Sequence, residues 1–116
     1  MTFEDIKPGD TIWYQSHTQF DLLLSANVIS VDRSRKRSCI IKFYNETLEE
    51  ELQAICTNSL EADGWIATSK EALKSYLIRR FKEEEEKTKR QIDSEIKKLI
   101  FHLGSIKNSI ERIEKA

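Results

Sequence analysis

Proline and glycine are scarce in this chain. Pro8 is the only proline, and the three glycines are Gly9, Gly64 and Gly104. Both residue types interrupt helices. Residues 68–116 contain no proline and one glycine, so this stretch is free to form one long helix.

Long hydrophobic runs are also missing. No stretch approaches the roughly 18 consecutive apolar residues of a membrane-spanning helix. The first five residues, Met1–Asp5, have neither the basic start nor the apolar stretch of a secretory signal peptide. We therefore expect a cytoplasmic protein with no membrane partner.

Cysteine and histidine are few, and the two cysteines and two histidines do not cluster at metal-ligand spacing. Cys39 and Cys56 fall in apolar, strand-like runs, which predicts reduced, buried thiols rather than a disulfide. The sequence has no Walker loop, no GxGxxG and no HExxH. We expect no metal, no cofactor and no enzymatic activity.

The net charge of −1 is the sum of two unequal parts. Residues 1–67 hold 11 acidic and 6 basic side chains, whereas residues 68–116 hold 9 and 13. This split predicts two parts with different surfaces, a small β domain at 1–67 and a helix at 68–116. Neither charge is large enough to indicate a polyanionic partner by itself.

Residues 1–67 contain five short runs that are rich in β-branched or aromatic residues or alternate between apolar and polar side chains. Turn signals, Pro8–Asp10 and Asp63–Gly64, precede the first and last of them. Five short strands with tight connections predict a small barrel or a bent antiparallel sheet. The expected strands are residues 11–15, 22–31, 38–44, 51–56 and 65–67.

Two segments carry a family resemblance. Ile6–Tyr14 (IKPGDTIWY) looks like the first strand of SH3-like barrels, including small barrel proteins of phages and mobile elements. Trp65–Leu73 (WIATSKEAL) is similar to the segment that opens the helix after those barrels. The resemblance covers residues 6–75 and implies an SH3-like fold and a phage or mobile-element origin, without implying functional residues. This chain departs from those proteins by continuing for several heptads beyond the first helix.

The predicted helix begins with a Thr-x-x-Glu capping box formed by Thr68 and Glu71, which places its first residue at Ser69. Residues 68–81 are expected to pack on the barrel and to cap its open end. The apolar side chains that recur there at helical spacing are Leu73, Tyr76, Leu77, Ile78 and Phe81.

Residues 82–91 predict a solvated helical spacer. Glu-before-Lys or Glu-before-Arg pairs at i,i+4 support a helix there by roughly 0.2–0.5 kcal/mol each. The alternative is an acidic run that mimics nucleic acid, although the following cations cancel its charge. The three pairs are Glu83–Lys87, Glu85–Lys89 and Glu86–Arg90.

From residue 92 to residue 115 the spacing of apolar side chains is that of a coiled coil. Isoleucine at both a and d favours trimers or tetramers. We expect self-association, with docking on a different protein or packing on the chain's own sheet as alternatives. Position a holds Ile96, Leu103 and Ile110, position d holds Ile92, Leu99, Ile106 and Ile113, and Ile100, Phe101 and Gly104 lie beside this seam at e, f and b.

The run Arg33–Arg37 joins the second and third expected strands and places four cations, Arg33, Arg35, Lys36 and Arg37, at one hairpin tip. Cations on a projecting ribbon are sufficient for phosphate contacts. Aromatic side chains on the strands would offer stacking surfaces. A solvated turn is the simpler interpretation. The aromatic residues are Trp13, Tyr14, Phe43 and Tyr44.

Two other polar groups are candidate sites. Ser16, His17 and Asp21 are close in sequence, but no strand–turn–helix elbow surrounds the serine, so we expect no triad. Glu49–Glu51 is a carboxylate cluster without further ligands at matching spacing, typical of a solvated strand entry.

Taken together, these patterns predict a non-enzymatic α+β protein that multimerises through its C-terminal helix and binds a target protein. The family resemblance suggests the hypothesis that it occludes a host defence enzyme such as a CRISPR nuclease, inside the cytoplasm of the host cell. The alternatives are a nucleic-acid-binding accessory protein that uses Arg33–Arg37, and a structural subunit of a larger particle.

Overall fold

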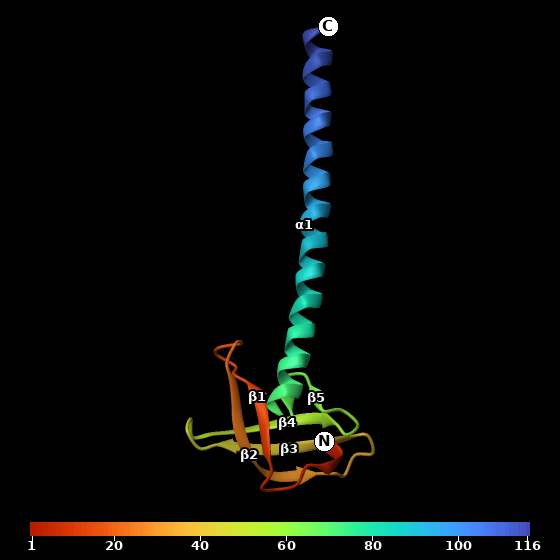
Figure 1. Ribbon diagram of the computed structural model, residues 1–116. Helices are drawn as coiled ribbons and strands as arrows, with labels where there is room; N and C mark the ends of the chain where they lie inside the picture. Colours follow the sequence, from red (N-terminus) through yellow and green to blue (C-terminus); the bar gives the residue numbers. More distant parts are fainter. The chain divides into compact units, whose positions relative to one another are not determined.

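The computed structural model describes residues 1–116 and shows an α+β protein (Figure 1). The chain divides into two compact units, Met1–Ile78 and Arg79–Ala116. The elements are η1 (Phe3–Asp5), β1 (Thr11–Gln15), β2 (Leu23–Asp32), β3 (Ser38–Asn45), β4 (Glu50–Thr57), β5 (Ala62–Asp63), β6 (Ile66–Ala67) and α1 (Lys70–Glu114).

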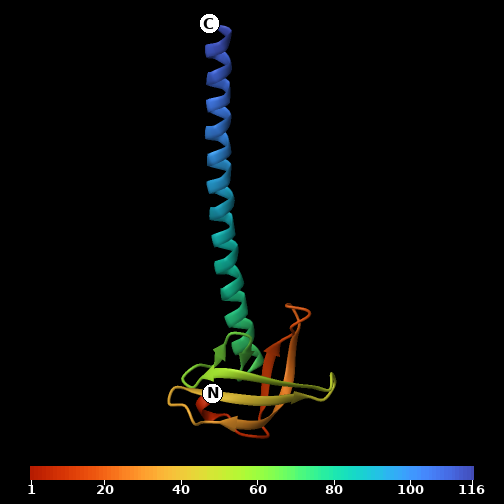
Figure 2. The same ribbon diagram turned by 180° about the vertical axis from the view of Figure 1, so that it is seen from behind.

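The strands form one antiparallel sheet in the order β4-β3-β2-β1-β6-β5. β1 to β4 follow one another as hairpins, and β6 returns to the free edge of β1. The sheet curls into a half-barrel, so that β3 and β4 run across the direction of β1 (Figures 1 and 2). A register shift in β2 between Val28 and Ser30 adds the local twist typical of a β-bulge.

The concave face of the sheet holds the core. Successive strand residues point to opposite faces, so Cys39, Ile41 and Phe43 are buried on one side of β3, as the alternation predicts. The rings of Tyr14, Phe43 and Trp65 pack against one another in tilted or edge-on arrangements, with centroids 5.2–6.1 Å apart. η1 covers one end of the core with Phe3, and Ile6 follows it.

The first four expected strands are confirmed to within one residue at each end, but the prediction of five strands is wrong. The single closing strand expected at 65–67 is a pair, β5 and β6, that turns at Gly64. Gly64 has φ +68°, a conformation that glycine adopts without steric cost. The β-branched and aromatic residues at 65–67 predict only β6, the second strand of this short hairpin, and not β5.

The predicted capping box is also wrong. α1 begins at Lys70, and the Ser69 Oγ accepts a hydrogen bond from the Ala72 N–H at 3.2 Å, so Ser69 is the cap. The Thr68 hydroxyl donates instead to the Met1 carbonyl at 2.7 Å. The spacing of Thr68 and Glu71 indicates a local partner, whereas the actual partner lies 67 residues away in the chain.

The first turns of α1 pack on the side of β1 opposite the main core. Trp13 alternates with Ile12 and Tyr14 along β1, so its ring lies on that other side, where it contacts a second cluster. Leu73 and Leu77 are buried in this cluster, whereas Ile78 is 51% exposed. The helix therefore covers the outside of β1 rather than the open end of the barrel.

Candidate interaction site

The second unit is a continuous stretch of helix with an exposed apolar face. α1 passes through Gly104 without a break and ends at Glu114. None of the seven seam side chains is buried, and each is 44–75% exposed. Ile100 and Phe101, which lie beside the seam, are 65% and 79% exposed. The residues of this seam are Ile92, Ile96, Leu99, Leu103, Ile106, Ile110 and Ile113.

The charged segment 82–91 precedes the seam, and every residue in it is exposed. Of the three expected i,i+4 pairs, Glu85–Lys89 is formed, with a Lys89 Nζ–Glu85 Oε1 distance of 3.0 Å. The hydrogen bond from Lys89 lowers the pKa of the Glu85 carboxyl. A second pair, Glu95–Lys98, lies further along at 3.7 Å. Solvated pairs of this kind stabilise the helix without covering the seam.

Arg33 differs from the other cations of the basic hairpin. Its Nη2 donates to the carbonyls of Phe3 and Ile6 at 2.9 and 2.8 Å. This guanidinium therefore fastens the N-terminal segment to the β2–β3 hairpin. Sequence spacing does not reveal this anchoring role. Arg33 is nevertheless exposed like its neighbours, and phosphate contact by the hairpin stays a prediction.

Three cations, Arg35, Lys36 and Arg37, remain exposed at the hairpin tip. Asn58 anchors the backbone of this tip, since its N–H donates to the Arg37 carbonyl at 2.9 Å. Asp32 adds a carboxylate beside the cations, and hydrogen bonds from Ser34 lower the pKa of that carboxyl. The tip is therefore a braced turn of mixed charge rather than a purely basic ribbon.

The loop after β1 contains Ser16 and His17, the candidate catalytic pair. The Ser16 Oγ accepts hydrogen bonds from the backbone N–H groups of Thr18 and Gln19 at 3.3 and 3.2 Å. It also shares one with the Thr18 hydroxyl at 3.2 Å. The His17 ring lies against Trp65, with centroids 4.7 Å apart. Ser16 shapes the turn and His17 packs on an aromatic ring, an arrangement without a nucleophile–base pair.

The Glu49–Glu51 cluster lies at the β3–β4 turn. Glu49 adopts φ +50°, which is uncommon for a residue with a side chain. The Tyr14 hydroxyl donates to Glu50 Oε2 at 3.0 Å. Burial, followed by this carboxylate, raises the pKa of Tyr14. No group of three or more His, Cys, Asp or Glu residues is placed to hold a metal ion.

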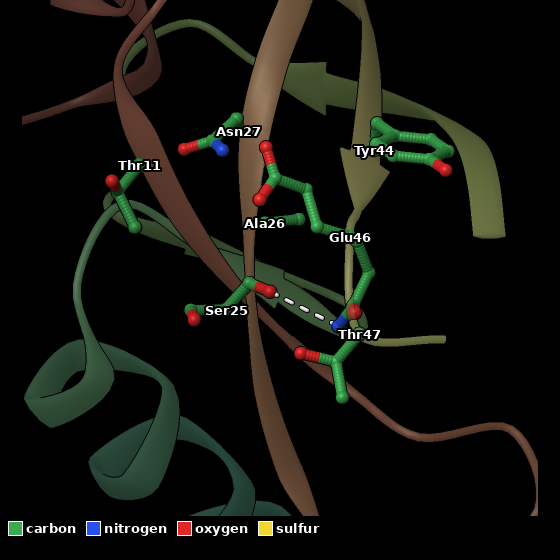
Figure 3. A pocket seen from close by; sticks show the side chains of 8 residues that line it. Thr11, Ser25, Ala26, Asn27, Tyr44, Glu46 and Thr47 are labelled. Atoms are coloured by element: carbon green, nitrogen blue, oxygen red, sulfur yellow. Dashed lines mark hydrogen bonds between the residues drawn. The ribbon is translucent and has the colours of Figure 1, made fainter. Parts of the chain in front are cut away.

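A hollow of about 200 Å³ lies between the β3–β4 turn, the start of β1 and the first half of β2. Figure 3 shows the Glu46 carboxylate extending toward Asn27 across it. The Asn45 amide closes one wall by donating to the Ser25 carbonyl at 3.1 Å. The hollow is lined mostly by polar side chains, among them the Glu46 carboxylate.

Both cysteines are buried and unbonded to each other, as expected. Cys39 and Cys56 are direct partners across β3 and β4. Burial raises the pKa of both thiols, that of Cys56 to about 12. The thiolate is the reactive form of cysteine, so these residues act as core side chains.

No helix is both long enough and apolar enough to cross a membrane. Comparison with protein-family models, with curated proteins and with solved structures gives no match to this chain. The surfaces of the two units are therefore the basis for assigning a function.

Proposed function

We propose that this chain is a non-enzymatic interaction protein that multimerises through the seam of α1 and offers several copies of its β unit to a target protein. The exposed seam carries this proposal. Seven large aliphatic side chains recur on one helical face, and a coiled coil is the arrangement that buries such a face. Monomeric soluble proteins rarely leave a continuous apolar stripe of this kind in water.

The free energy of burying the seam is of the right order for association. Full burial of a Leu or Ile side chain contributes roughly 1.5–3 kcal/mol, so a half-exposed one contributes about 1 kcal/mol. Seven such side chains on each of two helices offset an association cost estimated at about 4–15 kcal/mol. The two terms are comparable, and we expect assembly to depend on protein concentration.

Multimerisation would raise affinity for a target that presents repeated or neighbouring binding sites. Linked β units bind such a target with an avidity above that of a single unit, without new contacts. Occlusion of a host defence enzyme, which the family resemblance suggests, is one form of this function.

Light scattering and sedimentation across a range of protein concentrations test the self-association. We expect a multimer for the wild type and for Asn108→Asp, which adds a charge at the outward f position. Leu103→Asp places the same charge in the seam and should give a monomer. A wild-type chain that stays monomeric at every concentration would contradict the proposal.

The target is tested by affinity capture from host extracts with the same three proteins. A specific target should be retained by the wild type and by Asn108→Asp, and weakly by Leu103→Asp. Equal capture by all three would show that the seam plays no part in target binding.

A further inference from the structure

The flanks of the seam indicate which way two copies pair. In a coiled coil the e and g side chains lie beside the core and contact the partner helix. The e positions are Asp93, Ile100, Lys107 and Glu114, and the g positions are Thr88, Glu95, His102 and Ser109. All eight are exposed on the single chain, so all are available for such contacts.

A parallel pair makes poor use of these flanks. It places each g residue beside the e residue five positions later on the partner. Glu95 then lies beside Ile100 of the second copy, His102 beside Lys107, and Ser109 beside Glu114. This arrangement forms no ion pair and sets a carboxylate against an apolar side chain, which is unfavourable.

An antiparallel pair can match the e flank in one register, in which the g flank sets Glu95 beside Ser109 and His102 beside its own symmetry mate. In antiparallel coils e faces e, g faces g, and each a residue packs in a layer with a d residue of the partner. If Leu99 packs with Leu103 of the second copy, Ile96 packs with Ile106 and Ile92 with Ile110. Asp93 then lies on the same flank as Lys107 of the second copy, twice by symmetry.

The same register gives a role to Ile100, which otherwise widens the seam without a partner. Its symmetry mate lies next to it beside the two-fold axis, so the two isoleucines extend the apolar core at its centre. Sliding the pair by one heptad instead packs Leu103 with Ile106. That register brings Asp93 beside Glu114 and Ile100 beside Lys107, and both contacts are unfavourable.

We therefore propose that the occupant of the seam is a second copy of this chain, paired antiparallel with Leu99 opposite Leu103 and with Asp93 beside Lys107. This inference rests on the proposed multimerisation and adds its direction and register. The seam requires a partner that is an amphipathic helix with an opposite charge at each matching flank position. A second copy of α1 meets this requirement.

Disulfide trapping in the full-length protein tests the register. Leu99→Cys and Leu103→Cys proteins are prepared separately, mixed under reducing conditions and then oxidised. We expect a covalent dimer from the mixture and little from either variant alone. The wild type is the control, because its cysteines are 0% exposed and should remain monomeric on a denaturing gel.

The other geometries give different gels. A parallel pair would crosslink Leu103→Cys with itself, and the shifted antiparallel register would crosslink Leu103→Cys with Ile106→Cys. Either result would overturn the inference while the proposed function stands. A wild type that does not multimerise in solution would overturn both.

Charge reversal provides an independent measurement. Asp93→Lys or Lys107→Asp alone places like charges together at both ends of the pair, and each should weaken dimerisation roughly 5- to 10-fold. The double variant should recover most of the wild-type affinity. Because both residues are on the helix surface, the single variants keep the helix intact, and a double variant no stronger than either single one would contradict the pairing.

Discussion

The two units of this chain differ in whether their apolar side chains are buried or exposed to solvent. Residues 1–78 close their apolar side chains around Tyr14 and Phe43, both of which are 0% exposed. Residues 79–116 have no buried side chain and keep a stripe of aliphatic groups in contact with solvent. The first unit contains its own core, whereas the second has none within a single chain. Stability and assembly are therefore expected to respond to different substitutions.

The largest expected effect comes from making the same change in each unit. Phe43 is fully buried against Tyr14 and Trp65, so Phe43→Ala should lower the free energy of unfolding by about 3–5 kcal/mol. Phe101 is 79% exposed, and Phe101→Ala should change it by less than about 0.5 kcal/mol. Urea unfolding followed by tryptophan fluorescence reports the first unit alone, because both tryptophans are there. Equal effects would contradict the division.

A second contrast separates the cations of the β2–β3 hairpin. Arg33→Ala removes charged hydrogen bonds to two backbone carbonyls and should cost about 2 kcal/mol. Arg35→Ala, two residues away on the exposed tip, should cost little. Thermal unfolding of both variants checks this, and similar melting temperatures would mean that Arg33 does not brace the N-terminal segment.

Alkaline pH should weaken the first unit through its buried thiol groups. The pKa of Cys56 is raised from its ordinary value of 9.0 to about 12, so the folded state retains a proton that the unfolded chain releases. The contribution of the Cys56 thiol to the free energy of unfolding is fully present below pH 9. It falls by up to about 1.4 kcal/mol per pH unit as the pH rises toward 12. Urea midpoints measured from about pH 8 to 11 should show this decline. Cys56→Ala should make it shallower and leave the contributions of Cys39 and Tyr14, whose pKa values are also raised. An equally steep decline in the variant would assign the effect to other groups.

The smallest contrast is between two glycines. Gly104 has helical geometry and open space where a methyl group would lie, so Gly104→Ala should stabilise α1 by about 1 kcal/mol and strengthen self-association. Gly9 has φ +94°, and Gly9→Ala should destabilise the β unit by about 1 kcal/mol. Circular dichroism in the far ultraviolet follows the helix. A weaker multimer after Gly104→Ala would indicate that the helix must bend there.

Local patterns in the sequence are sufficient for the elements with strong periodicity. The alternation of Cys39, Ile41 and Phe43 predicts their burial, and the absence of proline after Pro8 predicts the long helix. Contacts between distant segments are not predictable in this way. Nothing near Arg33 or Thr68 reveals that their partners are carbonyls at the N-terminus, because each has equally plausible local partners.

The seam can be recognised in the sequence from its heptad spacing, whereas the sequence does not reveal which partner covers it. Heptad spacing is a local property, and the structure adds that the face is exposed and that Gly104 does not interrupt it. The flanking residues Asp93 and Lys107 resemble ordinary surface charges. The pairing proposed for them follows only from comparing two helices laid against each other.

The pairing of β1 with β6 has a consequence for synthesis. About fifty residues separate these strands, which at about 5–20 residues per second leaves β1 waiting roughly 3–10 s for its second neighbour. β2 covers one edge of β1 early, while the other edge remains an unpaired row of backbone groups. On a polysome, neighbouring nascent chains would also expose this edge, so β1 is open to co-translational mispairing during that interval.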